Sequence, residues 1–330
     1  MKNIQKDIKT GALKQVYLLS GEELYLRQQY KQNLLKAFAV DAEDMNFSRF
    51  EGKQTDVKEI ISLCETMPFF ADYRVVLIEN SGFFKNKCEE LPDYIKNLPE
   101  SVRLIFVEAE VDKRSRMYKV VKAVGGAAEF GRQTEKTLMR WAAGYLGNEG
   151  KKITQENMER FLEKTGNDMG NIQMEMEKLI SYTMGREIIT AEDIEAICTT
   201  QISNKIFEMV RAVAEKQQKK ALDLYYDLLM LKEPAMKILF LLAKQFRQLL
   251  LVRRYLDEGM QQAEIASSLG VQTFVVRNLL SCAHLYEIAQ LEKAIEDFAE
   301  MEEAVKTGRI GDRLSVELLI IQYSAAEKNK

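Results

Sequence analysis

Short apolar runs alternate with helical patterns over the first third of the chain. Two of these runs, Val75–Ile78 and Leu104–Val107, are apolar at every position, which is typical of strands that are buried on both faces of a parallel sheet. Further strand candidates lie at residues 16–19 and 46–50, with a weaker one at 128–130. Because amphipathic stretches separate the runs, the pattern predicts an α/β module with a parallel sheet that ends near Arg132.

Beyond Thr134 the strand signals fade and the pattern becomes helical. Four short amphipathic segments lie between residues 137 and 197, and Thr190 with Asp193 forms a capping-box pattern at the start of the last one. Longer helical segments begin near Ser203, and in one of them apolar residues recur at steps of three and four along a single face. These changes predict three domains, an α/β module, a small helical domain and an all-α domain, over residues 1–133, 134–202 and 203–330.

Composition and charge exclude several classes of protein. The 46% hydrophobic and 29% charged residues predict a soluble protein with real cores, and 47 basic against 50 acidic residues leave no strong net charge. The four cysteines are scattered and His284 is the only histidine, so neither a zinc site nor a histidine-dependent triad is supported. Since no signal-peptide core or span-length apolar segment occurs, we expect a cytoplasmic protein without a metal, a cofactor or a membrane partner.

The loop after the first apolar run has the strand, turn and helix layout of nucleotide-binding domains, but it lacks their chemistry. Its residues Ser20, Gly21, Glu22 and Glu23 include one glycine, and no Gly-Lys-Ser/Thr follows. We expect Glu22 and Glu23 in the first turn of the next helix, where two carboxylates would repel phosphate. Ser20 with Glu23 also fits a capping box. The pattern therefore predicts a degenerate loop that binds no nucleotide.

Two later runs also lack part of an ATPase site. Such a site needs an acidic pair at the end of an apolar strand to hold magnesium, whereas Glu79 and Glu108 each end a run alone. Either glutamate could be a surface residue at a strand end. A cryptic nucleotide hydrolase stays open as an alternative.

The connector between residues 66 and 72 carries two adjacent aromatic residues. Pro68 stops the preceding helical pattern and fixes an extended entry, so the rings of Phe69 and Phe70 can hardly point the same way and at least one is expected to be exposed. Two interpretations stay open. The rings plug the core, or they anchor the chain in a hydrophobic pocket of a partner.

A basic segment follows the fourth apolar run. It supplies four cations within seven positions, namely Lys113, Arg114, Arg116 and Lys119. A solvated helix start is the ordinary interpretation, and contact with nucleic-acid phosphate or with an acidic neighbouring subunit is the alternative.

Residues 263–279 have the spacing of a helix-turn-helix, with Gly270 at the turn. The second helix begins with Thr273-Phe-Val-Val, where a DNA reader would need polar side chains, so that Arg277 and Asn278 are the only candidate readers. A helical hairpin inside an assembly and a helix-turn-helix DNA-binding regulator both stay open.

Five stretches resemble, in the same order, the delta subunits of bacterial DNA polymerase III. They span nearly the whole chain and are specific jointly: VYLLSGEELYL (16–26), MPFFADYRVV (67–76), VDKRSRMYK (111–119), GNDMGNIQMEMEKL (166–179) and EIASSLGV (264–271). The resemblance implies an AAA-type fold made of an α/β module, a small helical lid and a C-terminal collar that joins the gamma/tau and delta-prime subunits of the clamp loader.

The resemblance also implies a function and a site. Such a subunit of the polymerase holoenzyme, a nucleotidyltransferase complex, binds and opens the sliding clamp (beta) for loading onto primed DNA during chromosomal replication, without hydrolysing ATP itself. Met67, Pro68, Phe69 and Phe70 fall on the family's clamp-binding segment. Phe69 stands where some members carry leucine, which preserves an apolar anchor.

Overall fold

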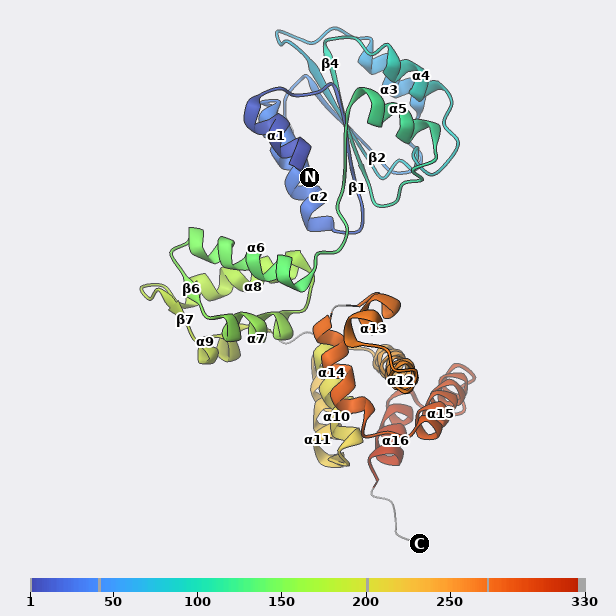
Figure 1. Cartoon of the computed structure of the whole chain (residues 1–330). Helices are drawn as coiled ribbons and strands as arrows, with labels where there is room; N and C mark the ends of the chain where they lie inside the picture. Colours follow the sequence, from blue (N-terminus) through green and yellow to red (C-terminus); the bar gives the residue numbers. More distant parts are fainter. Residues whose placement is uncertain (1, 41–42, 200–201, 272, 326–330) are drawn as a thin grey trace. The chain divides into compact units, whose positions relative to one another are not determined.

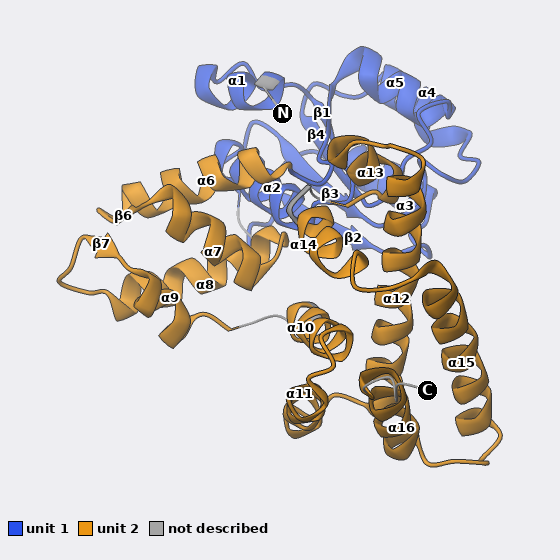
Figure 2. Cartoon of the chain, turned by 60° about the horizontal axis from the view of Figure 1, so that its bottom comes forward, with its two compact units in different colours: residues 1–133 blue, residues 134–330 orange. Residues whose placement is uncertain are grey.

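The computed structural model describes residues 2–40, 43–199, 202–271 and 273–325. The chain divides into two units, Met1–Gln133 and Thr134–Lys330 (Figure 2). The further boundary expected between residues 202 and 203 falls inside the second unit and stays a prediction. Among the helices of the described residues, none is both long and apolar enough to cross a lipid bilayer.

The first unit is built on a five-stranded parallel sheet. Its strands, in chain order, are β1 (Val16–Ser20), β2 (Phe47–Glu51), β3 (Arg74–Glu79), β4 (Val102–Glu108) and β5 (Gly126–Glu129). The strand order across the sheet is β2-β3-β4-β1-β5, and every neighbouring pair is parallel. All residues of β1 and β3 are buried, as the continuous apolar runs indicated. The predicted fold class, a parallel α/β sheet followed by helices, is confirmed.

Helices cover both faces of this sheet: α1 (Lys2–Thr10), α2 (Leu24–Ala37), α3 (Val57–Cys64), α4 (Glu90–Lys96) and α5 (Arg116–Val124). Figure 1 shows α1 and α2 on one side and α3, α4 and α5 on the other. Alternate residues of β1 serve the two faces, because Val16 and Leu18 belong to the core under α3 to α5, whereas Tyr17 contacts Phe38 at the end of α2. Helix α1 was not predicted, and its only apolar residues are Ile4 and Ile8.

The second unit begins with four short helices, as expected. They are α6 (Glu135–Asn148), α7 (Gln155–Thr165), α8 (Met169–Tyr182) and α9 (Ala191–Ile197). The predicted capping box of Thr190 with Asp193 is confirmed at the start of α9. Two-residue strands, β6 (Lys152–Ile153) and β7 (Ile188–Ile189), pair in parallel between these helices. They were not predicted, because two residues are too few to show the alternation of apolar and polar positions that indicates a strand.

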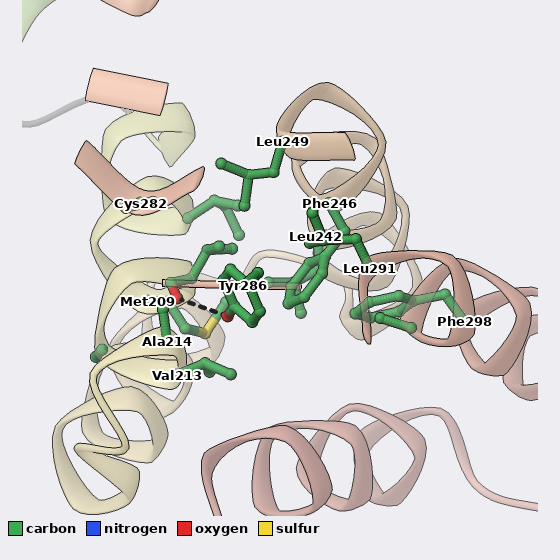
Figure 3. Close-up of a cluster of buried hydrophobic side chains, with 14 of the residues drawn as sticks. Met209, Val213, Ala214, Leu242, Phe246, Leu249, Cys282, Tyr286, Leu291 and Phe298 are labelled. Atoms are coloured by element: carbon green, nitrogen blue, oxygen red, sulfur yellow. Dashed lines mark hydrogen bonds between the residues drawn. The ribbon is translucent and has the colours of Figure 1, made fainter. Parts of the chain in front are cut away.

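The longer helices that follow share one hydrophobic core. They are α10 (Ile202–Ala214), α11 (Gln218–Met230), α12 (Ala235–Asp257), α13 (Gln262–Leu269), α14 (Thr273–Ala283), α15 (Ile288–Lys306) and α16 (Asp312–Ser324). Figure 3 shows three rings inside this core, those of Phe246 in α12, of Tyr286 between α14 and α15, and of Phe298 in α15. The ring centroid of Phe246 lies 5.6 Å from that of Tyr286 and 5.1 Å from that of Phe298. The hydroxyl of Tyr286 donates to the carbonyl of Val210 at 3.5 Å, so the buried phenol keeps a partner.

Candidate functional site

The loop at the carboxyl end of β1 does not take the predicted form. Ser20 is the last residue of β1, and its hydroxyl donates to the carbonyl of Ala128 at 3.3 Å. Helix α2 begins at Leu24, with Glu23 as its N-cap and Glu22 in the loop before it. The expected capping box of Ser20 with Glu23 and the expected place of both glutamates in the first helical turn are therefore wrong. The reason is that Ser20 is held in the strand ladder and cannot cap the helix.

Backbone carbonyls already occupy two amides that this loop would offer to a phosphate. The N–H of Gly21 donates to the carbonyl of Glu108 at 3.3 Å, and the N–H of Glu23 donates to the carbonyl of Phe130 at 2.9 Å. Gly21 has a φ of +119°, and a Cβ at this position would lie 2.3 Å from the carbonyl oxygen of Phe130. The glycine thus permits a close approach of two backbone segments, which accounts for a single glycine in a loop of this layout.

Glu79 and Glu108, the last residues of β3 and β4, are buried, so the interpretation of both as surface residues is wrong. The carboxylate of Glu79 accepts from Lys31 Nζ at 3.0 Å and from Arg49 Nε at 2.7 Å. The carboxylate of Glu108 accepts from the N–H of Ser81 at 2.9 Å, yet burial outweighs its hydrogen bonds and raises the pKa of Glu108. Both carboxylates are thus engaged by protein groups.

The aromatic pair lies in the segment between α3 and β3, and both rings are exposed. Phe70 is 95% exposed, Phe69 54% and Met67 84%, whereas Pro68 is half-buried. The rings of Phe69 and Phe70 meet edge to face with centroids 4.5 Å apart. This contact is possible because Phe70 has a φ of +50°, so the backbone turns there and does not place successive side chains on opposite sides. The alternative in which both rings plug the core is wrong.

Two buried residues that no sequence pattern singles out hold this segment. Asn46 is 5% exposed, and its side-chain amide donates to the carbonyl of Phe69 at 2.9 Å and accepts from the N–H of Phe69 at 2.6 Å. The guanidinium of Arg74 donates to the carbonyls of Met67 and Met45, each at 3.4 Å. Met45 is itself 71% exposed. Asn46 and Phe69 are 23 positions apart in the sequence, so only the folded chain reveals their contact.

The predicted basic segment lies at the start of α5, and its four cations are exposed. Three of them form ion pairs with neighbouring carboxylates, Lys113 with Glu129 (2.7 Å), Arg114 with Asp112 (3.1 Å) and Arg116 with Asp93 (2.5 Å). The local positive charge is therefore partly neutralised. Contact of Lys113, Arg114, Arg116 or Lys119 with DNA or with another subunit stays a prediction.

Helices α13 and α14 form the pair that the helix-turn-helix spacing predicted. Gly270 ends α13 in the left-handed conformation, with a φ of +63°. Ala266 and Val276 are buried in the core of the second unit, whereas Arg277 is exposed; the side chains of residues 273 and 274 lie outside the described part. Packing explains the geometry of this pair, and its role as a DNA reader stays an untested alternative. His284 lies exposed in the turn after α14.

Comparison with known proteins gives matches along nearly the whole chain. A model described as "DNA polymerase III, delta subunit" matches residues 17–128, and a model of the C-terminal domain of that subunit matches residues 203–323. The DNA polymerase III subunit delta of Bacillus subtilis is 29% identical over 99% of this chain and 98% of its own length. A probable DNA polymerase III subunit delta of Aquifex aeolicus is 23% identical over 78% of this chain and 76% of its own.

A solved structure also matches over the full length. The Bacillus subtilis DNA clamp loader delta protein has a TM-score of 0.69 and 26% sequence identity, covering 98% of this chain and 99% of that one. Similarity in sequence and in structure therefore points to the same group of proteins.

Proposed function

Since the chain belongs to the family of DNA polymerase III delta subunits, which are clamp-loader proteins, we propose that it binds the sliding clamp through Met67, Pro68, Phe69 and Phe70. By this contact it opens the clamp for loading onto primed DNA, while sister subunits hydrolyse ATP. The observation that carries the proposal is the exposure of the adjacent rings of Phe69 and Phe70. Aromatic residues that fill a partner's pocket supply much of the energy of protein interfaces.

The exposed rings of this loop can supply part of the free energy of a specific contact. A phenylalanine buries about 150–250 Å², so at about 25 cal/mol per Å² the docking of Phe70, which is 95% exposed, is worth roughly 4–6 kcal/mol before the costs of association. Phe69, at 54% exposure, adds roughly 2–3 kcal/mol. The two rings are therefore proposed as the anchors of the contact, which further surface must complete.

Clamp opening follows if the loop fits the open clamp better than the closed one. A bound protein shifts a conformational equilibrium only by the difference between its affinities for the two states. The rings of Phe69 and Phe70 would then hold the open interface, and the helices of residues 203–330 would join the chain to the gamma/tau and delta-prime subunits.

The first loop supports a subunit that holds no nucleotide. The amides of Gly21 and Glu23 are bonded to backbone carbonyls, and the carboxylates of Glu79 and Glu108 are engaged by protein groups. Titration of the isolated chain with a fluorescent ATP analogue should therefore show no saturable binding. Saturable binding at micromolar concentrations would favour the alternative of a cryptic nucleotide hydrolase.

Co-elution with a purified bacterial sliding clamp tests the contact itself. The wild-type chain should elute with the clamp on gel filtration, and the variant carrying Phe69→Ala and Phe70→Ala should elute separately, because it lacks the proposed anchors. The variant should still fold, because in the wild type both rings are exposed and contribute little to the core. Phe240→Ala is the matched control, since it removes a ring that is 63% exposed from the second unit. Co-elution of the double variant to the same extent as the wild type would contradict the proposal.

A further inference from the structure

The loop that carries the aromatic pair is bonded to a residue that the fold already holds in place. Asn46 directly precedes β2, and its backbone carbonyl accepts from the N–H of Val75 in β3 at 2.8 Å. Its own N–H donates to the carboxylate of Asp44 at 2.6 Å. With its backbone fixed on both sides, Asn46 directs its side-chain amide to the backbone of Phe69.

The two bonds from Asn46 fix the peptide groups on both sides of the Phe69 side chain. The Asn46 amide donates to the carbonyl of Phe69 and accepts from its N–H, at 2.9 and 2.6 Å, in the manner of two paired strand residues. Phe70 follows in the left-handed conformation with a φ of +50°, which a residue with a bulky side chain rarely adopts unless its surroundings impose it. The edge-to-face contact of the rings therefore depends on an anchored Phe69.

A buried arginine secures the approach to this anchor. Arg74 is 9% exposed, and one guanidinium donates to the carbonyls of both Met67 and Met45. The loop and the segment before β2 are thus joined at two adjacent points, by Arg74 at Met67 and by Asn46 at Phe69. This arrangement brings the exposed residue Met45 into the neighbourhood of the aromatic loop.

We propose that Asn46 is a positioning residue, which holds the Phe69 and Phe70 rings in their docking conformation before any partner arrives. The meaning of this role for clamp loading rests on the proposed function. A protein whose binding conformation is only partly populated loses apparent affinity in proportion to the missing fraction. Asn46 keeps that fraction high without contributing a contact of its own, because it is buried beneath the loop.

Hydrogen exchange at the Phe69 amide tests the inference without any clamp. In the wild type the Asn46 oxygen protects this amide, and in Asn46→Ala we expect the amide to exchange at least about tenfold faster because its acceptor is gone. Asn46→Asp keeps an oxygen acceptor for the N–H of Phe69 but loses the donor to its carbonyl, so it should retain part of the protection. Asn171→Ala is the matched control, because it removes a side-chain bond to the carbonyl of Thr165 in the second unit. Unchanged exchange of Phe69 in Asn46→Ala would overturn the proposal.

Clamp affinity supplies the second measurement. Asn46→Ala should weaken binding about tenfold, as expected when a loop held by two hydrogen bonds is released, whereas Asn171→Ala should bind like the wild type. In the Phe70→Ala background, Asn46→Ala should weaken clamp binding distinctly less, since Asn46 acts through the ring pair. An equal loss in both backgrounds would indicate a general structural role and refute positioning. If even the wild-type chain bound no clamp, the proposed function would fall, while exchange at Phe69 would still decide the positioning role.

Discussion

Replacing Gly21 by alanine tests the conclusion that this glycine serves backbone packing. The new Cβ would lie 2.3 Å from the carbonyl oxygen of Phe130 and 2.7 Å from its carbonyl carbon, and these backbone atoms cannot rotate aside. A φ of +119° adds strain of about 1–3 kcal/mol for any other residue. Moving Phe130 away breaks its bonds to the carbonyl of Ser20 and the N–H of Glu23, each worth about 1 kcal/mol.

Together these effects should lower the free energy of unfolding of Gly21→Ala by about 3–5 kcal/mol, which is a large part of the roughly 5–15 kcal/mol that stabilises a folded protein. Urea unfolding followed by circular dichroism measures it. Gly52→Ala is the matched control, because Gly52 has a φ of +92° but no atom within 4 Å of an added Cβ. This variant should therefore lose stability only through the strain of the dihedral angle. The only tryptophan, Trp141, lies in the second unit, and its fluorescence should be unaffected by either change. A loss in Gly21→Ala no larger than that in Gly52→Ala would refute the reasoning.

Three further predictions concern single residues. In thermal unfolding, the free energy of unfolding of Phe70→Gly should exceed that of Phe70→Ala by about 0.5–1 kcal/mol, because glycine adopts the left-handed conformation without strain. Equal stability of the two variants would show that the turn is not strained. The guanidinium of Arg186 holds the pKa of Asp193 below the ordinary 3.8, so the stability that this pair provides is present above that value and is lost as the pH falls through the lowered pKa. Asp193→Asn should therefore flatten the acid limb of stability in urea unfolding between pH 2 and 7, followed by tryptophan fluorescence, and an unaltered limb would contradict the assignment. Burial raises the pKa of both the Cys64 thiol, to about 12, and the Cys88 thiol, but Cys64 is fully buried and Cys88 only half-buried. At pH 8 an alkylating reagent should therefore label Cys88 first and Cys64 only after unfolding, as mass spectrometry can show; equal labelling in the native protein would refute this.

The three central strands β1, β3 and β4 could be predicted from the sequence because they are buried on both faces and their apolar runs are continuous. Short or largely polar elements escaped prediction for the converse reason. Helix α1 buries little more than Ile4, and the paired strands β6 and β7 have two residues each. Glu22 and Glu23 were wrongly expected in the first turn of α2, because β1 continues through Ser20, which no local pattern distinguishes from a helix cap.

The candidate site could be predicted only where its residues are adjacent in the sequence. Phe69 and Phe70 are neighbours beside a proline, and the sequence predicted that at least one of their rings is exposed. That both rings are exposed and touch each other depends on the positive φ of Phe70, which the sequence does not reveal. The role of Asn46 depends on a contact between distant segments, and the burial of Glu79 depends on Lys31 from α2 and Arg49 from β2. Such pairings arise from the order of the strands in the sheet, which the apolar pattern does not specify.

The most direct test of the central claim is a calorimetric titration of a bacterial sliding clamp with the wild-type chain and with the variant carrying Phe69→Ala and Phe70→Ala. We expect saturable binding of the wild type, and a loss of at least about thirtyfold in the variant, since two central aromatic anchors are removed. Its thermal unfolding should match that of the wild type. Equal affinity of the two proteins for the clamp would contradict the claim that Phe69 and Phe70 form the clamp-binding site.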